Sequence, residues 1–192
     1  MRRERLRLHS LHLVYNMGVL SSQQIRSLIN SDQPLASGLV DIDIQLQPNG
    51  IDLTLGSLES LTGPGQIGLT NDDRILASAV DVPFGGDGFV HLIPGIYIAR
   101  LNEAVALPSN VMALAKPRSS LLRNGITVNN AVWDAGYAGR SQVQLMVSNP
   151  HGFRVAKNAR IVQMIFLTLD TATDVLYSGI YQGESLNQAK RD

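Results

Sequence analysis

The sequence predicts an all-β domain, a barrel or jelly roll, and three features of its pattern support that prediction. After residue 34 the chain is a succession of short apolar runs, several of which alternate apolar and polar residues as half-buried strands do. Combinations of proline, glycine and asparagine that form turns separate these runs. Helical spacing is concentrated near the start of the chain, so alternating strand and helix units are not indicated.

The first expected element is a helix. The segment QQIRSLIN at 23–30 has its apolar residues at helical spacing and follows Ser21 and Ser22, which predicts a capped amphipathic helix of about three turns. Residues 1–17 would precede it as an N-terminal arm, unless Met17 is the true start.

The strands are expected in order after this helix. Two alternating stretches, 42–46 and 51–55, flank the turn-forming residues 47–50. Residues 61–90 are rich in glycine, aspartate and proline, and PFGGDG at 83–88 is expected to form a flexible loop. One helical turn fits 119–123. The apolar segments expected to supply the other strands are 90–101, 103–115, 126–133, 142–148 and 161–169.

The composition excludes several classes of protein. With 192 residues the chain has the length of one domain with short appendages. Cysteine is absent, which excludes disulfides and thiolate chemistry and fits a cytoplasmic protein. No apolar run reaches the length of a membrane span, so no membrane partner is expected. No protein-held metal is expected either, because metal-ligand spacing is lacking among His9, His12, His91 and His151.

A stretch at 117–139 gathers the groups that suit a polyanionic ligand with a polar ring. It reads PRSSLLRNGITVNNAVWDAGYAG and holds arginines, serines, asparagines, one aspartate and one tyrosine. From Lys116 to Arg160 there are seven basic residues and one acid, so this part of the neutral chain carries about +6 and the remainder about −6. Such charges also occur on solvated strand ends, but a local positive field favours a small anion over a long nucleic acid.

Six motifs then follow one another along the chain. They are VLSSQQIRSLI, QPNGIDLTLG, the segment from IPGIYIARL to PRSSLLRNGI, VWDAGYAGR, KNARIVQMIF and YSGIYQG. Together they resemble the superfamily of trimeric dUTPases and dCTP deaminases, and the first two resemble its deaminase branch. The match runs from about Gly18 to Gly183, and the ordered set is far more specific than any one motif.

The resemblance implies a distorted β-barrel or jelly roll that assembles as a homotrimer, with active sites between subunits. The dUTPase-like β domain would cover 18–176. The polar tail at 177–192 would be mobile without ligand and would close the active site, with Tyr181 and Gln182 over the substrate.

The resemblance also implies hydrolysis of dUTP to dUMP and pyrophosphate. Asp134 matches the catalytic aspartate that activates the attacking water, and Tyr137 matches the aromatic residue that packs on the deoxyribose. Arg118 and Ser119 match the phosphate-binding turn, because arginine presents a planar fork of donors and serine bonds a phosphate oxygen. Mg²⁺ is the expected cofactor, carried by the triphosphate. Further candidates for phosphate binding are Ser120, Arg123 and Gln163.

Recognition of the base is assigned to the hairpin that begins at 126. A side-chain amide and the nearby backbone can satisfy uracil, and they would leave polar groups unpaired against cytosine. Either Asn129 or Asn130 would supply the amide, with the backbone near Ala131 and Val132.

One position separates the two chemistries of this superfamily. Its deaminases have a glutamate ten residues after the hairpin aspartate, which moves protons between water and the leaving nitrogen. Here that position holds Gln144, which is placed among the substrate-binding residues. An amide is no general base near neutral pH, so a dUTP diphosphatase is favoured. The alternatives are a dCTP deaminase, alone or bifunctional, and a non-catalytic nucleotide-binding trimer.

Overall fold

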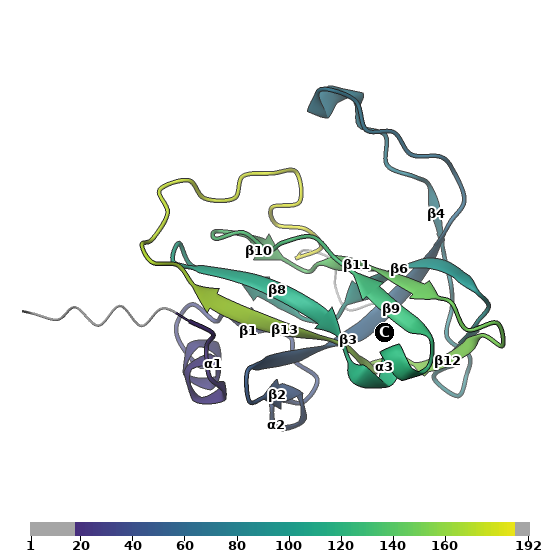
Figure 1. The fold of residues 1–192 in the computed structure, drawn as a ribbon, viewed down its shortest axis with the longest axis horizontal. Helices are drawn as coiled ribbons and strands as arrows, with labels where there is room; N and C mark the ends of the chain where they lie inside the picture. Colours follow the sequence, from purple (N-terminus) through teal and green to yellow (C-terminus); the bar gives the residue numbers. More distant parts are fainter. Residues whose placement is uncertain (1–17, 187–192) are drawn as a thin grey trace, which may run out of the picture.

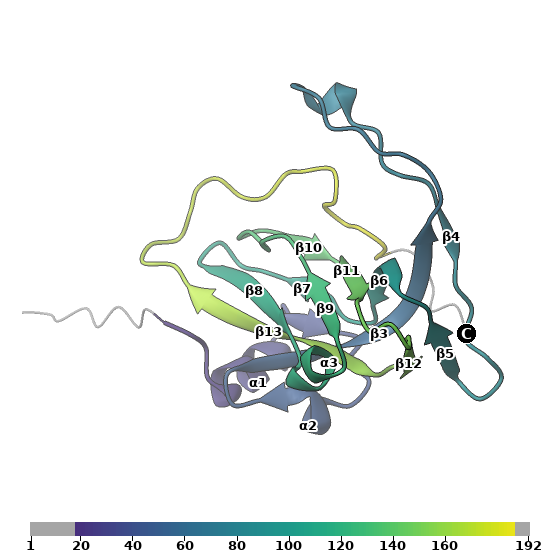
Figure 2. The same cartoon turned by 45° about the vertical axis from the view of Figure 1, so that its right-hand side comes forward.

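One curved β-sheet forms the body of the protein, which a computed structural model describes over residues 18–186 (Figure 1). Its ends come together because the short helix α3 (Ser119–Arg123) joins the first and last strands of the path (Figure 2). All its pairings are antiparallel, and the all-β, barrel-like fold is confirmed. Along the path the strands are β8 (Val111–Pro117), β13 (Arg160–Thr168), β3 (Gly50–Leu61), β6 (Gly95–Leu101), β11 (Gln142–Val147) and β9 (Ile126–Asn129).

Shorter strands complete the architecture. β2 (Leu46–Gln47) and β4 (Ala79–Asp81) both pair with β3. A three-stranded sheet consists of β1 (Ala36–Ser37), β7 (Ala104–Ala106) and β10 (Ala138–Gly139), and a two-stranded sheet of β5 (Phe89–Leu92) and β12 (Phe153–Ala156). Within 18–186 no helix is long and apolar enough to cross a membrane.

Strand periodicity sets which side chains face the core. In β11 every second residue is buried, and the residues between them, Gln142 and Gln144 among them, face outward. The outward side chains of β6 next to them include Ile98 and Arg100. A partly polar surface therefore covers β6, β11 and β9. The largest fully buried side chains beneath include Phe166, Leu53, Leu55, Leu101 and Leu145.

The helix near the N-terminus forms where the sequence predicts it. α1 (Ser22–Ile29) begins with a capping box, in which the Ser21 hydroxyl accepts from the Gln24 backbone and the Gln24 side chain accepts from Ser21 N. It has 8 residues, about two turns rather than three. The predicted arm at 1–17 lies outside the described residues.

The strand predicted over 42–46 is wrong. Residues Ile42–Gln45 form the one-turn helix α2, and only Leu46 enters a strand. Asp41 caps this turn by accepting from the backbone of Asp43 and Ile44, so local bonds replace a ladder. The alternation was misleading because the polar Gln45 is buried while Ile44 is exposed.

The segment 61–90, rich in glycine, aspartate and proline, is partly structured, and PFGGDG at 83–88 lies outside helices and strands. Residues 62–78 form an arm that projects from the body beyond β3 and β4 and carries the 3-10 turn η1 (Asn71–Asp73) at its end (Figures 1 and 2). Two backbone bonds between Gln66 and Ile75 hold its two sides together. The base of this arm leads into one wall of the cavity described next.

Candidate functional site

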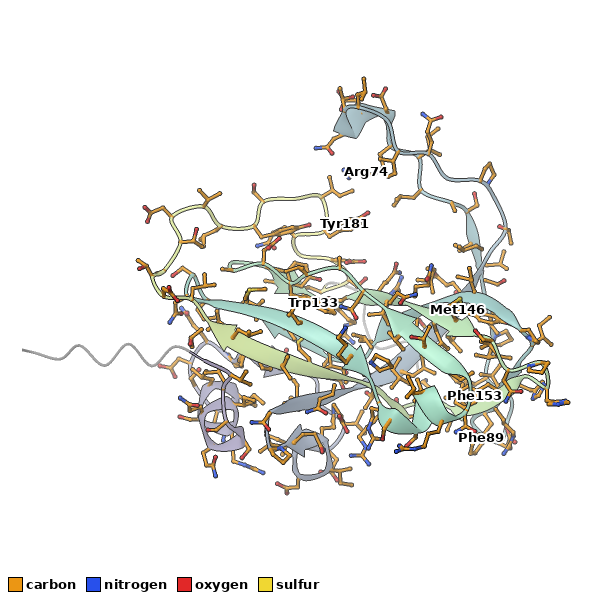
Figure 3. All side chains as sticks on the ribbon, in the orientation of Figure 1. Arg74, Phe89, Trp133, Met146, Phe153 and Tyr181 are labelled. Atoms are coloured by element: carbon orange, nitrogen blue, oxygen red, sulfur yellow. The ribbon has the colours of Figure 1, made fainter. Side chains whose placement is uncertain are left out.

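A large cavity lies between three segments of the chain. It has a volume of about 710 Å³. Hairpin 131–137, the base of the projecting arm and the C-terminal segment 177–184 form most of its walls. In Figure 3, Trp133 lies in the hairpin below Tyr181, and Arg74 marks the projecting arm. The lining residues with polar side chains include Glu59, Asp134, Tyr137, Ser141, Gln142, Tyr177, Tyr181 and Glu184.

Asp134 reaches this cavity because its backbone is fixed on both sides. Before it, Trp133 forms two backbone bonds with Ala113 of β8, at 2.9 and 3.1 Å. After it, Tyr137 N donates to Asp134 O at 3.1 Å and closes a turn. The carboxylate itself is exposed. Gly136 has a φ of 85°, and a Cβ there would lie 2.7 Å from Leu176 Cβ, so this tight turn requires glycine.

A buried hydrogen-bonded group supports the turn from beneath. Trp133 Nε1 donates to Ser141 Oγ at 2.6 Å, and the Tyr137 hydroxyl lies 2.9 Å from the same oxygen. The Tyr137 ring meets the edge of Tyr177, with ring centroids 5.5 Å apart. Burial raises the pKa of Tyr137, so its hydroxyl stays protonated. The residues flanking Asp134 are therefore held rigidly.

The C-terminal segment is bonded to the same hairpin. The Gln182 side chain accepts from Ala138 N at 3.0 Å and donates to Gly136 O at 2.9 Å. Gly183 N donates to Ala138 O at 2.8 Å, and Tyr177 N donates to Ala135 O at 2.9 Å. Tyr181 lines the cavity. Residues 187–192 lie outside the described part of the chain, and the mobility predicted for the tail stays a prediction.

Two further acids line the cavity, and the sequence pattern did not point to them. Glu184 follows the closing motif directly, and its backbone oxygen accepts from Arg140 N at 2.8 Å. Burial raises the pKa of Glu184, while the nearby Arg100 lowers it. Glu59 lies 3.7 Å from Arg100 in an ion pair. Only the position of Glu184 after YQG could have suggested a role, and Glu59 gave no signal in the sequence.

A smaller polar pocket adjoins the cavity. It has a volume of about 320 Å³ and shares Ile98, Ala131 and Gln142 with the larger cavity. Its other lining residues include both candidate base-reading residues, Asn129 and Asn130, together with Gln144. Val132 lines only the larger cavity.

The amides of this pocket are bonded in a definite arrangement. Asn129 Nδ2 donates to Gln144 Oε1 at 3.0 Å. Asn130 Nδ2 turns back to Ala131 O at 3.0 Å. No carboxylate is among the residues that line this smaller pocket.

The proposed phosphate-binding turn lies elsewhere on the chain. Arg118 is the N-cap of α3, and its Nε contacts Asp52 Oδ2 at 2.9 Å. Neither Arg118 nor Asp52 is among the residues that line the cavity holding Asp134. Trp133 pairs with Ala113, and Arg118 lies five residues further on, so about 16 Å of β8 separates the two backbones. The other candidates near this turn are Ser119, Ser120 and Arg123 on α3 and Gln163 on β13, which pairs with Lys116.

Asp52 orders the base of this turn. It is 1% exposed and also accepts from Arg160 Nη1 at 3.2 Å. Burial raises the pKa of Asp52, and the two guanidinium groups of Arg118 and Arg160 lower it. Arg160 donates a second bond to Ile44 O at 2.8 Å, so it ties α2 to this site.

The described residues contain no group of three or more histidine, cysteine, aspartate or glutamate side chains that could hold a metal ion.

Comparison with known proteins identifies the family. The sequence matches the profile of the dCTP deaminase-like family over residues 19–169. The chain belongs to this family. Within it, a protein of Methanosarcina mazei is 48% identical over 171 residues, which cover 89% of this chain and 100% of that protein, and is described as a probable deoxyuridine 5'-triphosphate nucleotidohydrolase. A protein of Archaeoglobus fulgidus with the same description is 44% identical, with 89% of this chain and 99% of that protein covered.

A solved structure in the deaminase-like family agrees with the fold. The 2'-deoxycytidine 5'-triphosphate deaminase from Agrobacterium tumefaciens superposes with a TM-score of 0.61 at 29% identity. The superposition covers 79% of this chain and 49% of that chain, so this chain spans about half the length of that deaminase. The resemblance read from the six motifs is confirmed.

Proposed function

We propose that this protein is a dUTP diphosphatase, which hydrolyses dUTP to dUMP and pyrophosphate. The observation that carries the proposal is the pairing of two adjoining spaces. One holds the exposed carboxylate of Asp134 beside Tyr137, and the other is lined by amides and lacks a carboxylate. The descriptions of the Methanosarcina mazei and Archaeoglobus fulgidus relatives support the same activity.

Asp134 would activate the attacking water. Its carboxylate accepts a proton from water as the water oxygen bonds to phosphorus, and the bond between the α-phosphoryl group and pyrophosphate breaks. The rigid turn between Trp133 and Tyr137 fixes the carboxylate, which favours a single productive position of the water. The ring of Tyr137 would form the wall against which the deoxyribose packs.

The triphosphate would contact α3 rather than the hairpin. Arg118 and Ser119 begin this helix, where side-chain donors and free backbone N–H groups favour an anion. Ser120, Arg123 and Gln163 would add further donors. Because about 16 Å of β8 separates this turn from Asp134 in one chain, we infer a homotrimer in which α3 of one subunit completes the cavity of its neighbour.

Mg²⁺ fits this site as a companion of the substrate. No cluster of side chains among the described residues provides enough ligands for an ion, whereas the oxygens of a bound triphosphate would. When bound with the triphosphate, Mg²⁺ neutralises part of the phosphate charge. The acids that line the cavity are Glu59, Asp134 and Glu184.

The base would lie in the smaller pocket, next to Asn129, Asn130 and Gln144. Deamination of dCTP requires a group there that takes a proton from water and returns it to nitrogen. The Gln144 amide cannot do so near neutral pH, which disfavours the dCTP deaminase alternative.

Replacing Asp134 with asparagine tests this proposal. D134N should bind dUTP with affinity close to wild type but lose turnover by about 10²–10⁴-fold, because the water loses its base. The matched control is Asp174→Asn, which removes an exposed carboxylate that does not line the cavity. A non-catalytic nucleotide-binding protein would show no dUTP turnover in wild type and no difference between these two variants.

A further inference from the structure

Two amide side chains face each other across neighbouring strands beside the cavity. Asn129 ends β9 and is directly opposite Gln144 of β11 in the strand register. Side chains at such opposed positions lie on the same face of the sheet, about 4.5–5.5 Å apart at Cβ. Asn129 Nδ2 donates to Gln144 Oε1 at 3.0 Å.

This bond decides which end of the Gln144 amide is left for a ligand. An amide has one acceptor oxygen and one nitrogen with two N–H donors. Asn129 holds Oε1 toward its own side chain, so the opposite end of the amide, Gln144 Nε2, points away from Asn129 and is the group that faces a ligand in the pocket. Asn130 is turned to Ala131 O and does not share in this bond.

A pyrimidine ring distinguishes these two ends of an amide. Uracil carries a carbonyl at position 4, which accepts a hydrogen bond, and cytosine carries an amino group there, which donates. The Gln144 Nε2 donor can therefore satisfy uracil, whereas against cytosine it would meet another donor and both would be left unpaired. Unpaired polar groups give strong discrimination in a closed site.

We propose that Asn129 is a positioning residue that sets the base specificity of this site by fixing the amide of Gln144. Gln144 Nε2 contacts the 4-oxo group of the pyrimidine, and Asn129 itself does not need to touch the base. This inference rests on the proposed dUTP site and assigns separate roles to its two amides. Without Asn129, the amide of Gln144 turns about its last torsion and presents either end, because that torsion has a broad, nearly two-fold profile.

The Asn129→Asp variant tests this assignment by reversing the hydrogen bond. The carboxylate that N129D introduces can only accept, so Gln144 Nε2 turns toward it and Oε1 turns toward the ligand. Binding of the dUTP analogue should weaken by about tenfold and binding of the dCTP analogue should strengthen by about tenfold. Isothermal titration calorimetry with the α,β-imido triphosphates of deoxyuridine and deoxycytidine measures both without turnover.

Two further variants keep the test independent of charge and folding. Asn129→Ala frees the Gln144 amide and should reduce the preference for the deoxyuridine analogue by about tenfold. Thr127→Asp places the same new charge two residues away, opposite Met146 rather than Gln144, and should weaken both analogues equally.

The outcomes separate this inference from the function on which it rests. A preference that N129D and N129A leave unchanged overturns the role of Asn129, even if wild type hydrolyses dUTP. Equal loss of both analogues in N129D and N129A overturns it as well, since that pattern is structural. A wild-type protein that neither binds the deoxyuridine analogue nor hydrolyses dUTP overturns the proposed function and this inference together.

Discussion

Ser141 is the residue whose removal should most clearly disturb the support of the site. It is 7% exposed, and its hydroxyl is the common partner of Trp133 Nε1 and the Tyr137 hydroxyl. Ser141→Ala removes that oxygen and adds no new group. The indole N–H can only donate, so it is left without an acceptor at a buried position.

The expected loss of stability follows from these two bonds. A buried donor without a partner costs about 1–3 kcal/mol, and the bond lost by the Tyr137 hydroxyl costs about 0.5–1.5 kcal/mol. The free energy of unfolding of S141A should therefore be lower by about 2–4 kcal/mol. Because Trp133 and Tyr137 flank Asp134, turnover of dUTP should fall as well.

Urea unfolding at one fixed protein concentration measures this loss, since subunit association would make the midpoint depend on concentration. Trp133 is the only tryptophan, so its fluorescence reports on this site directly. The matched control is Ser148→Ala on the exposed end of the same segment, which should change stability by less than about 0.5 kcal/mol. If S141A is as stable as S148A, the buried bonds of Ser141 do not support the hairpin and the reasoning fails.

Two other predictions follow from the structure. Burial raises the pKa of Glu103, so the folded state holds the proton of this carboxyl group more tightly than the unfolded state does. That contribution to the free energy of unfolding decreases as pH rises from the ordinary glutamate pKa through the folded one. Glu103→Gln should remove that part of the pH dependence. Unfolding midpoints measured between pH 4 and 7 check this, and the same pH profile in the variant as in wild type would contradict it. Gln182→Ala removes both side-chain bonds to the hairpin. Chymotrypsin should therefore cleave at Tyr181 faster in this variant, while the global unfolding midpoint changes little. Equal cleavage rates in the variant and wild type would refute the role of Gln182.

Part of the sheet could be predicted because some of its strands, such as β11, alternate buried and outward-facing residues. In β11, Val143, Leu145 and Val147 are buried while Gln142 and Gln144 face outward, as a period of two requires. The turn at 47–50 could also be predicted, from its turn-forming residues, and in the structure Pro48 and Asn49 connect β2 and β3 in one hairpin. Local patterns of this kind depend on neighbouring residues only.

The errors and gaps arise where distant contacts decide the outcome. Gln45 breaks the expected alternation because its side chain bonds Glu103 at 2.7 Å, far away in sequence. Glu184 enters the cavity only because the chain returns to the hairpin, which no local pattern encodes. Strand register likewise lies beyond any local pattern, and it places Asn129 rather than Asn130 opposite Gln144.

The separation of Asp134 from Arg118 shows a further limit of sequence motifs. The two motifs are close in sequence, only sixteen positions apart, yet β8 and β9 carry them to different ends of the sheet. In the proposed homotrimer they would meet between subunits, and such a contact is a property of surfaces rather than of spacing along the chain.

The most direct test of the proposed function is product analysis with the purified protein and Mg²⁺, with dUTP and dCTP offered separately. We expect dUMP and pyrophosphate from dUTP in equal amounts, with dCTP left intact. Release of ammonia from dCTP would contradict the role assigned to Gln144, and absence of any product from dUTP would contradict the function itself.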